Sequence, residues 1–477
     1  MGKKKKKLLY GSISITSAVI LIVTNISLQT IIDPDSPDDK KINEKLWDII
    51  VPNQYETIQD AIENAKPNDR ILVRSGVYKS SPRFLPYPLI IDKENLTICG
   101  QDKNSTIITG RGGNTPIYIR ADSVNLTGFT IKGNGLNDSL LQVYSDDCII
   151  SDNIFICNDF YDGTEYGIVF YQADNNSFFD NNITGADRGL EMRGSNHNNI
   201  YNNNFSGNDI GVSIGGILSV DFSRRILHRW YYKPCVNNIF ANNMFSANYQ
   251  GLIADSVHNN KFLNNTFESK GWYGLILSRS TNNVVKNNTF NKNGLELCGK
   301  DKEDFIQVVE DNIVNGKPLY YLHKKTNTIV PKDAGQIILV DCYNIRIQRT
   351  KISHTTTGIM IAYSTGTKVS YNELSNNDRG IYLFYTVSST ITKNNFIDNG
   401  RDASFISLGF INSIRTIWRG NYWDSWIGTR SLLLSLTNKW IFGRIHQRKI
   451  IDLMGDLQIG LLTRNVDRRP ARRPYSI

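Results

Sequence analysis

Acidic and aromatic residues recur at one position of a repeated segment. Each lies two residues before a glycine that precedes aliphatic residues, and the row consists of Glu165, Asp187, Asp209, Tyr249 and Trp272. Stacked carboxylates repel one another unless a cation or a guanidinium such as that of Arg188 neutralises them. Carboxylate oxygens bind Ca²⁺, and aromatic rings with a polar edge suit amphipathic partners such as sugars. The row therefore predicts a carbohydrate-binding strip, with an accompanying Ca²⁺ site at Glu165, Asp187 and Asp209.

Acid–base chemistry would have to come from the same region. Two carboxylates held near each other have pKa values that split, as in enzymatic acid–base pairs. If the protein is an enzyme, we expect Glu191, Asp187 and Arg188 to be catalytic in a polysaccharide lyase, hydrolase or epimerase. The alternative is that they are ordinary turn and surface residues, since turns favour Asp. We find no Gly-x-Ser-x-Gly motif and no short-spaced histidine pair for copper, so we expect binding rather than catalysis.

The residues of this row lie side by side only if each repeat forms one coil of a regular structure. Paired asparagines, an apolar residue and a Gly-aliphatic step recur about every 22 residues between positions 181 and 396. A coil of this length cannot bury its apolar face alone, but stacked coils share one core. We therefore predict an all-β fold, a single right-handed parallel β-helix with three strands per coil. The apolar landmarks are Ile183, Phe205, Phe245, Phe267, Phe290, Ile352, Leu374 and Phe396, and the glycines are Gly167, Gly189, Gly211, Gly251, Gly274, Gly294, Gly358 and Gly380.

Both rows of landmarks break at the same two places, which indicates insertions at about 216–235 and 299–335. Each begins about five residues after a landmark glycine, so both should leave the solenoid at one edge, which is often the binding face. The first insertion contains Trp230 and Tyr231, which we add to the expected carbohydrate-binding residues. Cys235 and Cys298 lie at the edges of the insertions, and a disulfide between them is one alternative to two thiols.

Both termini carry recognisable segments. Residues 57–62 are typical of a short helix capped by Thr57, which would cover the open end of the solenoid. Five lysines at 3–7 precede an uncharged stretch at 8–32 that is long enough to cross a bilayer. We predict a signal anchor or transmembrane segment at 1–32, a linker at 33–47, the β-helix at 48–400, and a C-terminal cap with a basic tail at 401–477. A cleaved signal peptide is the alternative to the anchor.

Charge limits the partners. The formal net charge is +9, and the lysines at 3–7 supply five of these charges, so the remainder carries only +4. That is too little for a nucleic-acid-binding protein.

The lysines at 3–7 also predict the orientation in the membrane. With these lysines cytoplasmic, everything after residue 33 lies on the outer side of the membrane. We expect a monomer at the cell surface, with a polysaccharide or surface glycan and the membrane as partners.

Several segments resemble known β-helix proteins. Residues 55–62, 76–78 and 96–100 resemble the opening of pectin-lyase-like proteins, and 312–344 looks like the NosD-type branch, named for a copper-associated accessory factor. Residues 420–424 and 470–475 are similar to the tail of archaeal surface members. This fold hosts lyases, hydrolases, epimerases and inert surface proteins. We therefore predict a membrane-anchored, extracytoplasmic carbohydrate-binding surface protein; a polysaccharide enzyme and a NosD-like copper accessory protein are the alternatives.

Overall fold

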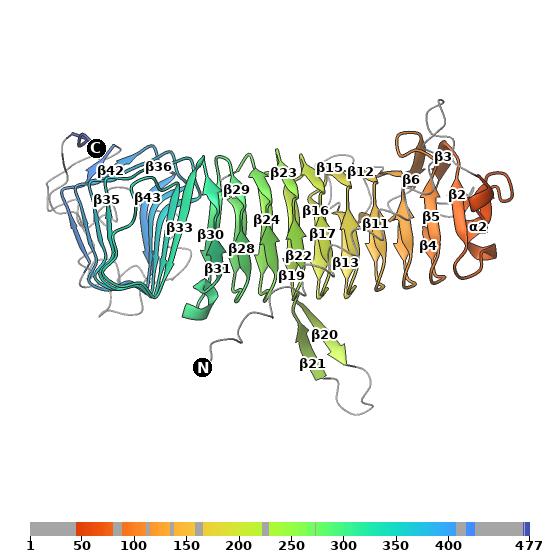
Figure 1. Cartoon of the computed structure of the whole chain (residues 1–477), viewed down its shortest axis with the longest axis horizontal. Helices are drawn as coiled ribbons and strands as arrows, with labels where there is room; N and C mark the ends of the chain where they lie inside the picture. The colour runs from red at the N-terminus through yellow and green to blue at the C-terminus, as the bar shows by residue number, and fades with distance from the viewer. Residues whose placement is uncertain are drawn as a thin grey trace, which may run out of the picture.

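The chain forms a parallel β-solenoid with very little helix, as predicted (Figure 1). The computed structural model describes residues 44–79, 88–110, 115–133, 138–157, 166–221, 229–271, 273–406, 416–424, 471 and 473–477. Short strands pair with the equivalent strands of the next coil, so that each coil contacts mainly its neighbours. The predicted signal anchor at 1–32 lies outside the described residues. Within the described ones, no helix is both long and apolar enough to span a bilayer.

The first stack of coils has three sheets, and its coils follow one another along the long axis of the molecule (Figure 1). Sheet 1 contains β1 (Ile49–Val51), β2 (Arg70–Val73), β5 (Thr97–Gly100), β8 (Asn125–Thr127), β11 (Ile149–Ser151), β14 (Ser177–Phe179), β17 (Asn199–Tyr201), β22 (Ile239–Ala241), β25 (Lys261–Leu263), β28 (Val284–Lys286) and β31 (Val308–Glu310). Sheet 2 contains β4 (Leu89–Ile91), β7 (Ile117–Ile119), β10 (Ser139–Val143), β13 (Tyr166–Tyr171), β16 (Arg188–Arg193), β19 (Ile210–Gly215), β24 (Gln250–Asp255), β27 (Tyr273–Ser278) and β30 (Gly294–Cys298).

Sheet 3 runs through both stacks of the molecule. Its first part contains β3 (Gly76–Lys79), β6 (Thr106–Thr109), β9 (Thr130–Lys132), β12 (Ile154–Ile156), β15 (Asn182–Thr184), β18 (Asn204–Ser206), β23 (Met244–Ser246), β26 (Thr266–Glu268), β29 (Thr289–Phe290) and β32 (Ile313–Val314). It continues into the second stack as β33 (Lys317–His323), β34 (Gln336–Val340), β37 (Thr357–Ala362), β40 (Arg379–Phe384) and β43 (Arg401–Ile406).

The second stack is completed by two sheets of four strands. One contains β35 (Arg346–Gln348), β38 (Lys368–Ser370), β41 (Thr390–Thr392) and β44 (Ile417–Arg419), and the other contains β36 (Lys351–Ser353), β39 (Glu373–Ser375), β42 (Asn395–Ile397) and β45 (Tyr422–Trp423). The remaining elements are η1 (Glu44–Leu46), α2 (Ile58–Asn64), η2 (Lys302–Phe305) and a hairpin of β20 (Ile217–Asp221) and β21 (Arg229–Lys233).

The predicted apolar landmarks of the first stack form one column in its core, and Ile352, Leu374 and Phe396 form another column in the core of the second stack. Phe205, Phe245, Phe267 and Phe290 occupy paired positions on successive strands of sheet 3 and are fully buried. Their rings stack with centroid separations of 5.3, 4.7 and 5.0 Å. Stacking of identical residues is possible because parallel strands in register repeat at about 4.8 Å. The 22-residue period is therefore one turn of the solenoid.

The paired asparagines divide two tasks between them. The first of a pair takes the left-handed backbone that the turn requires, as Asn202 and Asn242 do with φ of 56° each. The second is buried and continues a ladder from coil to coil. The backbone N–H of Asn203 donates to Asn243 Oδ1 at 3.0 Å, and that of Asn243 donates to Asn265 Oδ1 at 2.9 Å. These hydrogen bonds satisfy buried backbone N–H groups in the turns, which have no partner in a β-sheet.

A helix covers the first end of the solenoid, and a stacked tryptophan forms the last described step of the core at the other end. Thr57 Oγ1 accepts a hydrogen bond from the Asp60 backbone N–H at 3.0 Å, which confirms the predicted cap of α2. The side chains of Ile58 and Ile62 on this helix are buried in the first core. At the other end Trp423 stacks on Phe396 with centroids 4.3 Å apart. Much of the predicted cap and tail at 401–477 lies outside the described residues.

The two predicted insertions have different structures. The first contains the β20–β21 hairpin, which stands away from the solenoid (Figure 1). The second, expected at 299–335, holds a further coil, because β31 pairs with β28 and β32 pairs with β29. After it, β33 runs antiparallel to β32 and parallel to β34, and this starts the second stack.

The second stack is turned so that one of its sheets covers the end of the first (Figure 1). Met360 and Phe384 of this sheet are buried in the first core, whereas Ile359 and Ile361 are buried in the second. Met360 is therefore enclosed between the two cores and is not exposed to solvent. The open end of the first stack would otherwise expose apolar residues and unpaired strand edges to water.

Candidate functional site

Three residues of the predicted binding row lie side by side at the start of sheet 2. The backbone N–H of Ile210 donates to the Asp187 carbonyl at 2.8 Å, and that of Gln250 donates to the Asp209 carbonyl at 2.8 Å. Asp187, Asp209 and Tyr249 are thus on consecutive coils, and Tyr249 is 58% exposed. The other two predicted members, Glu165 and Trp272, lie outside the described residues.

The charge of Asp187 acts on its neighbour Asp209. Burial and the negative charge of Asp187 raise the pKa of Asp209, and Arg188 opposes this effect. Among the residues that the structure describes, no group of three or more His, Cys, Asp or Glu side chains is placed to hold a metal ion. The Ca²⁺ site expected at Glu165, Asp187 and Asp209 stays a prediction, because Glu165 is not among those residues.

Glu191, the predicted acid or base, is buried on the outer face of sheet 2 between two arginines. Its Oε2 accepts a hydrogen bond from Arg188 Nη1 at 2.8 Å, and its Oε1 accepts one from Arg193 Nε at 3.0 Å. The residue is only 5% exposed, so it is not a solvated surface residue. Both guanidiniums also lie 5.6 Å from the ring centre of Tyr166. We call Tyr166, Arg188, Glu191 and Arg193 the arginine cluster.

Glu191 holds this cluster in place electrostatically. Burial lowers the pKa of Arg188 and of Arg193, but the hydrogen bond and the charge of Glu191 outweigh it, so that both pKa values are raised. The two arginines therefore stay charged, and the cluster carries one net positive charge. Because each carboxylate oxygen accepts a hydrogen bond from a guanidinium, Glu191 positions the two arginines.

Three tyrosines extend the cluster along the same face. Tyr118 stacks on Tyr144 with ring centroids 6.3 Å apart, and Tyr144 contacts Tyr171 at 5.8 Å. They point outward, because the residues beside them in the strands face the core. Tyr171 pairs with Arg193 across β13 and β16. This tyrosine strip (Tyr118, Tyr144 and Tyr171) and the arginine cluster form one continuous surface on sheet 2.

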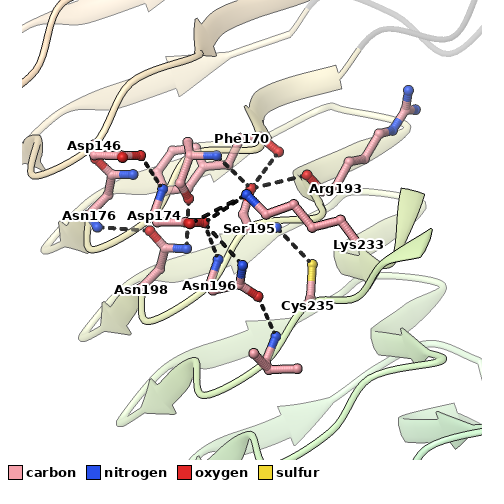
Figure 2. A network of polar contacts seen from close by, with 12 residues as sticks. Asp146, Phe170, Asp174, Asn176, Arg193, Ser195, Asn196, Asn198, Lys233 and Cys235 are labelled. Atoms are coloured by element: carbon pink, nitrogen blue, oxygen red, sulfur yellow. Dashed lines mark hydrogen bonds and ion pairs between the residues drawn. The ribbon is translucent and has the colours of Figure 1, made fainter. Parts of the chain in front are cut away.

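A polar network fixes the corner where sheet 2 ends (Figure 2). Asp146 Oδ1 accepts from the Asp174 backbone N–H at 2.7 Å, and Asp174 Oδ1 accepts from that of Asn196 at 2.8 Å. Lys233, at the end of the β20–β21 hairpin, forms an ion pair with Asp174 at 3.4 Å. Figure 2 shows the Arg193 guanidinium pointing away from this network. The aspartates of the corner are thus committed to backbone amides and to Lys233, and the hairpin is tied beside Arg193.

The structure does not join Trp230 and Tyr231 to the predicted row. Both belong to β21, where they pair with Val220 and Ser219 of β20 in the projecting hairpin (Figure 1). Cys235 and Cys298 are not linked to each other by a disulfide.

A second buried glutamate on sheet 2 joins the two stacks of coils. Glu296 is 1% exposed and accepts hydrogen bonds from Arg379 Nη1 at 2.9 Å and Thr357 Oγ1 at 2.8 Å. Burial raises the pKa of Glu296, and Arg379 and Thr357 oppose the rise. Asp378 binds Arg401 at 3.2 Å beside this pair. The bonds of Glu296 join β30 of the first stack to β37 and β40 of the second, and the Asp378–Arg401 pair links β43 to the same site.

The tyrosine strip was not expected from the sequence, although a signal for it exists. Tyr171 and Arg193 each lie four residues after a landmark glycine, at a position that faces outward. The coils that precede Tyr171 in the chain are also longer than 22 residues. Leu141 pairs with Ile117, 24 positions earlier, and Ile168 pairs with Leu141, 27 positions earlier, so a search at 22 residues does not align Tyr118 and Tyr144.

Two protein-family models match the chain. One, described as "Periplasmic copper-binding protein (NosD)", matches residues 93–225. The other, described as "Right handed beta helix region", matches residues 228–334 and 325–417. No curated protein matches.

Several solved structures are similar to this chain. A variant of the catalytic domain of GH87 alpha-1,3-glucanase in complex with nigerose is 13% identical, with 80% of this chain and 68% of that chain covered and a TM-score of 0.39. PfbA, a surface adhesin of Streptococcus pneumoniae, is 14% identical, with 74% and 87% covered and a TM-score of 0.40. DFA-IIIase from Arthrobacter chlorophenolicus A6 is 14% identical, with 70% and 87% covered and a TM-score of 0.39.

The two family matches together run along most of the described solenoid, and the stacked coils have the parallel pairing that both matches imply. The chain is therefore a right-handed parallel β-helix repeat protein, of which residues 93–225 are similar to the NosD family.

Proposed function

We propose that the protein is a membrane-anchored, extracytoplasmic β-helix surface protein that binds carbohydrate along the outer face of sheet 2 and catalyses no covalent reaction. The observation that carries the proposal is the tyrosine strip, which continues into the arginine cluster on a flat sheet. Tyrosine rings offer an apolar face and a polar edge, the combination that a sugar ring requires. Asp187, Asp209 and Tyr249 border the same face and add polar and aromatic contacts.

The arrangement around Glu191 favours binding over catalysis. A general acid must carry a proton and a general base must have a free lone pair directed at the substrate. Glu191 accepts from Arg188 at 2.8 Å and from Arg193 at 3.0 Å, and its side chain is only 7% exposed. It supports the surface by keeping two guanidiniums in fixed positions. Glu191→Ala should therefore weaken glycan binding, and turnover of a polysaccharide that disappears in this variant would make the protein an enzyme.

Two features support the location. The lysines at 3–7 before an uncharged stretch at 8–32 are typical of a segment that leaves the chain on the outer side of the membrane. The NosD family model is described as periplasmic, which also supports an extracytoplasmic protein.

A glycan array tests the proposal. The full chain should bind one or more polysaccharides, with and without Ca²⁺ compared. The double variant Tyr144→Ala, Tyr171→Ala should lose at least about fivefold in affinity, since stacking aromatic contacts contribute about 0.5–1.5 kcal/mol each.

The matched control is Phe179→Ala, Tyr201→Ala, which removes an aromatic pair with centroids 4.7 Å apart on the outer face of sheet 1. This variant should bind like the wild type. Equal binding by both double variants would remove sheet 2 as the binding face, and no binding to any glycan would end the proposal.

The match to the NosD model also supports a second candidate, a helper in copper-site assembly. Metal analysis of the purified full chain after exposure to copper separates the two. Stoichiometric copper that survives dialysis would favour the second candidate, and sub-stoichiometric copper would favour the first.

A further inference from the structure

We infer that the glycan bound by this face is acidic, and that Arg120 and Arg193 meet its carboxylate or sulfate groups at the two ends of the tyrosine strip. This inference rests on the proposed function and adds the chemical class of the ligand. It follows from the positions of four residues on consecutive strands.

Arg120, Tyr144, Tyr171 and Arg193 occupy one outward column. Val143 pairs with Ile119 on one side and with Phe170 on the other, so the residues that follow these three are neighbours. Tyr171 pairs directly with Arg193. Three steps of about 4.8 Å separate the first and last members, so the two arginines lie about 14 Å apart with two tyrosines between them.

The two arginines have unused hydrogen-bonding capacity. Arg120 is exposed, lies 5.1 Å from the ring centre of Tyr118, and forms no ion pair with any carboxylate of the described residues. Arg193 uses its Nε on Glu191 and its Nη2 on Tyr166, and its side chain is 38% exposed. A guanidinium has five N–H donors and binds carboxylates or sulfates through two of them at once.

Charges around the strip favour an anion at these positions. Arg188 and Arg193 share the single negative charge of Glu191, and Arg120 adds a further positive charge. At the nearby corner the charge of Asp174 is balanced by Lys233, and Asp146 accepts a backbone N–H (Figure 2). Asp122 and Asp146 at this corner bind backbone amides and form no ion pair within the described residues, and Asp187 and Asp209 are at the opposite edge of the sheet, where the strands begin. A neutral glycan would cover the tyrosines but leave Arg120 without a counter-ion.

The test compares three polymers by isothermal titration against the full chain: alginate, which carries carboxylates, dextran sulfate, which carries sulfates, and neutral dextran. At least one acidic polymer should bind more tightly than dextran, and its affinity should fall as salt is raised. Arg120→Gln should weaken that binding about tenfold, because hydrogen bonds to charged groups contribute about 1.5–3 kcal/mol. Arg346→Gln, an exposed arginine on β35 of the second stack, is the control and should leave binding unchanged.

The outcomes separate this inference from the proposed function. Equal binding of dextran and the acidic polymers, or unchanged affinity in Arg120→Gln, would overturn the acidic class while carbohydrate binding stands. Failure of all three polymers and of the glycan array would overturn both. Preference for alginate over dextran sulfate, or the reverse, identifies the anionic group and supports the inference either way.

Discussion

The junction between the two stacks gives a quantitative prediction. Arg379→Met removes the guanidinium that lies 2.9 Å from the carboxylate of Glu296, a residue whose side chain is 1% exposed. Removing one partner of a buried ion pair costs about 3–5 kcal/mol, because the remaining charge is left in an apolar environment. We therefore expect the free energy of unfolding to fall by about that amount. Equilibrium urea unfolding followed by far-UV circular dichroism measures it.

The sequence offers a matched control, because the segment Asp-Arg-Gly occurs at 187–189 and again at 378–380. Arg188 pairs with Glu191, but its side chain is 34% exposed, and Glu191 keeps Arg193 when Arg188 is replaced. Arg188→Met should therefore cost only about 0–1 kcal/mol. Equal losses in the two variants, or a loss below about 1 kcal/mol in Arg379→Met, would refute the role of the buried pair.

The loss of stability in Arg379→Met should depend on pH. Without Arg379, burial raises the pKa of Glu296 with less opposition, so its folded-state pKa lies above the unfolded value. Such a group contributes stability that is present below the unfolded pKa and lost as pH rises through the folded pKa. The deficit of Arg379→Met relative to the wild type should thus be smaller at about pH 4 than at about pH 8. A deficit that grows in acid would contradict the burial of a charged Glu296.

Three further predictions concern the core. Asn243→Ala should lower the free energy of unfolding in urea by about 2–4 kcal/mol, because buried backbone groups on adjacent coils lose their hydrogen-bond partner. Asn242→Gly should leave it nearly unchanged, because glycine adopts the left-handed backbone at this position. Equal effects of the two variants would contradict the different roles of the paired asparagines. Phe267→Ala should cost about 3–5 kcal/mol and lower Tm, and an unchanged Tm would contradict the stacked column. Burial raises the pKa of Cys99 and of Cys298 to about 12, so iodoacetamide at pH 8 should label both on the order of a thousandfold more slowly than free cysteine until urea is added. Labelling of the native protein at the free-cysteine rate would contradict the raised pKa of these two thiols.

Much of the solenoid could be predicted because its core repeats one residue per coil. Phe205, Phe245 and Phe267 stack as expected, and the spacing also placed Asp187 beside Asp209. The repeat could not reveal the turn between the stacks. A long gap between landmarks reads equally well as an insertion or as a further coil, and only tertiary packing shows that Met360 faces the first core.

The site was predicted in part for a similar reason. Asp187 and Arg188 lie in coils of regular length, where counting residues gives the neighbours directly. The coils that contain Tyr118 and Tyr144 have 24 and 27 residues, so the nearness of these two tyrosines becomes visible only once strand pairing is known. The burial of Glu191 depends on side chains from two positions of its own strand, Arg188 and Arg193, which turn inward over it.

Hydroxyl-radical footprinting of the full chain, with and without the glycan that binds best on the array, tests the location and the existence of the binding face together. Bound glycan should protect Tyr118, Tyr144 and Tyr171 from oxidation, and leave Phe179 and Tyr201 on sheet 1 oxidised at their original rates. Protection of Tyr201 with no change at Tyr144, or unchanged oxidation throughout at a saturating glycan concentration, would contradict a carbohydrate-binding surface on sheet 2.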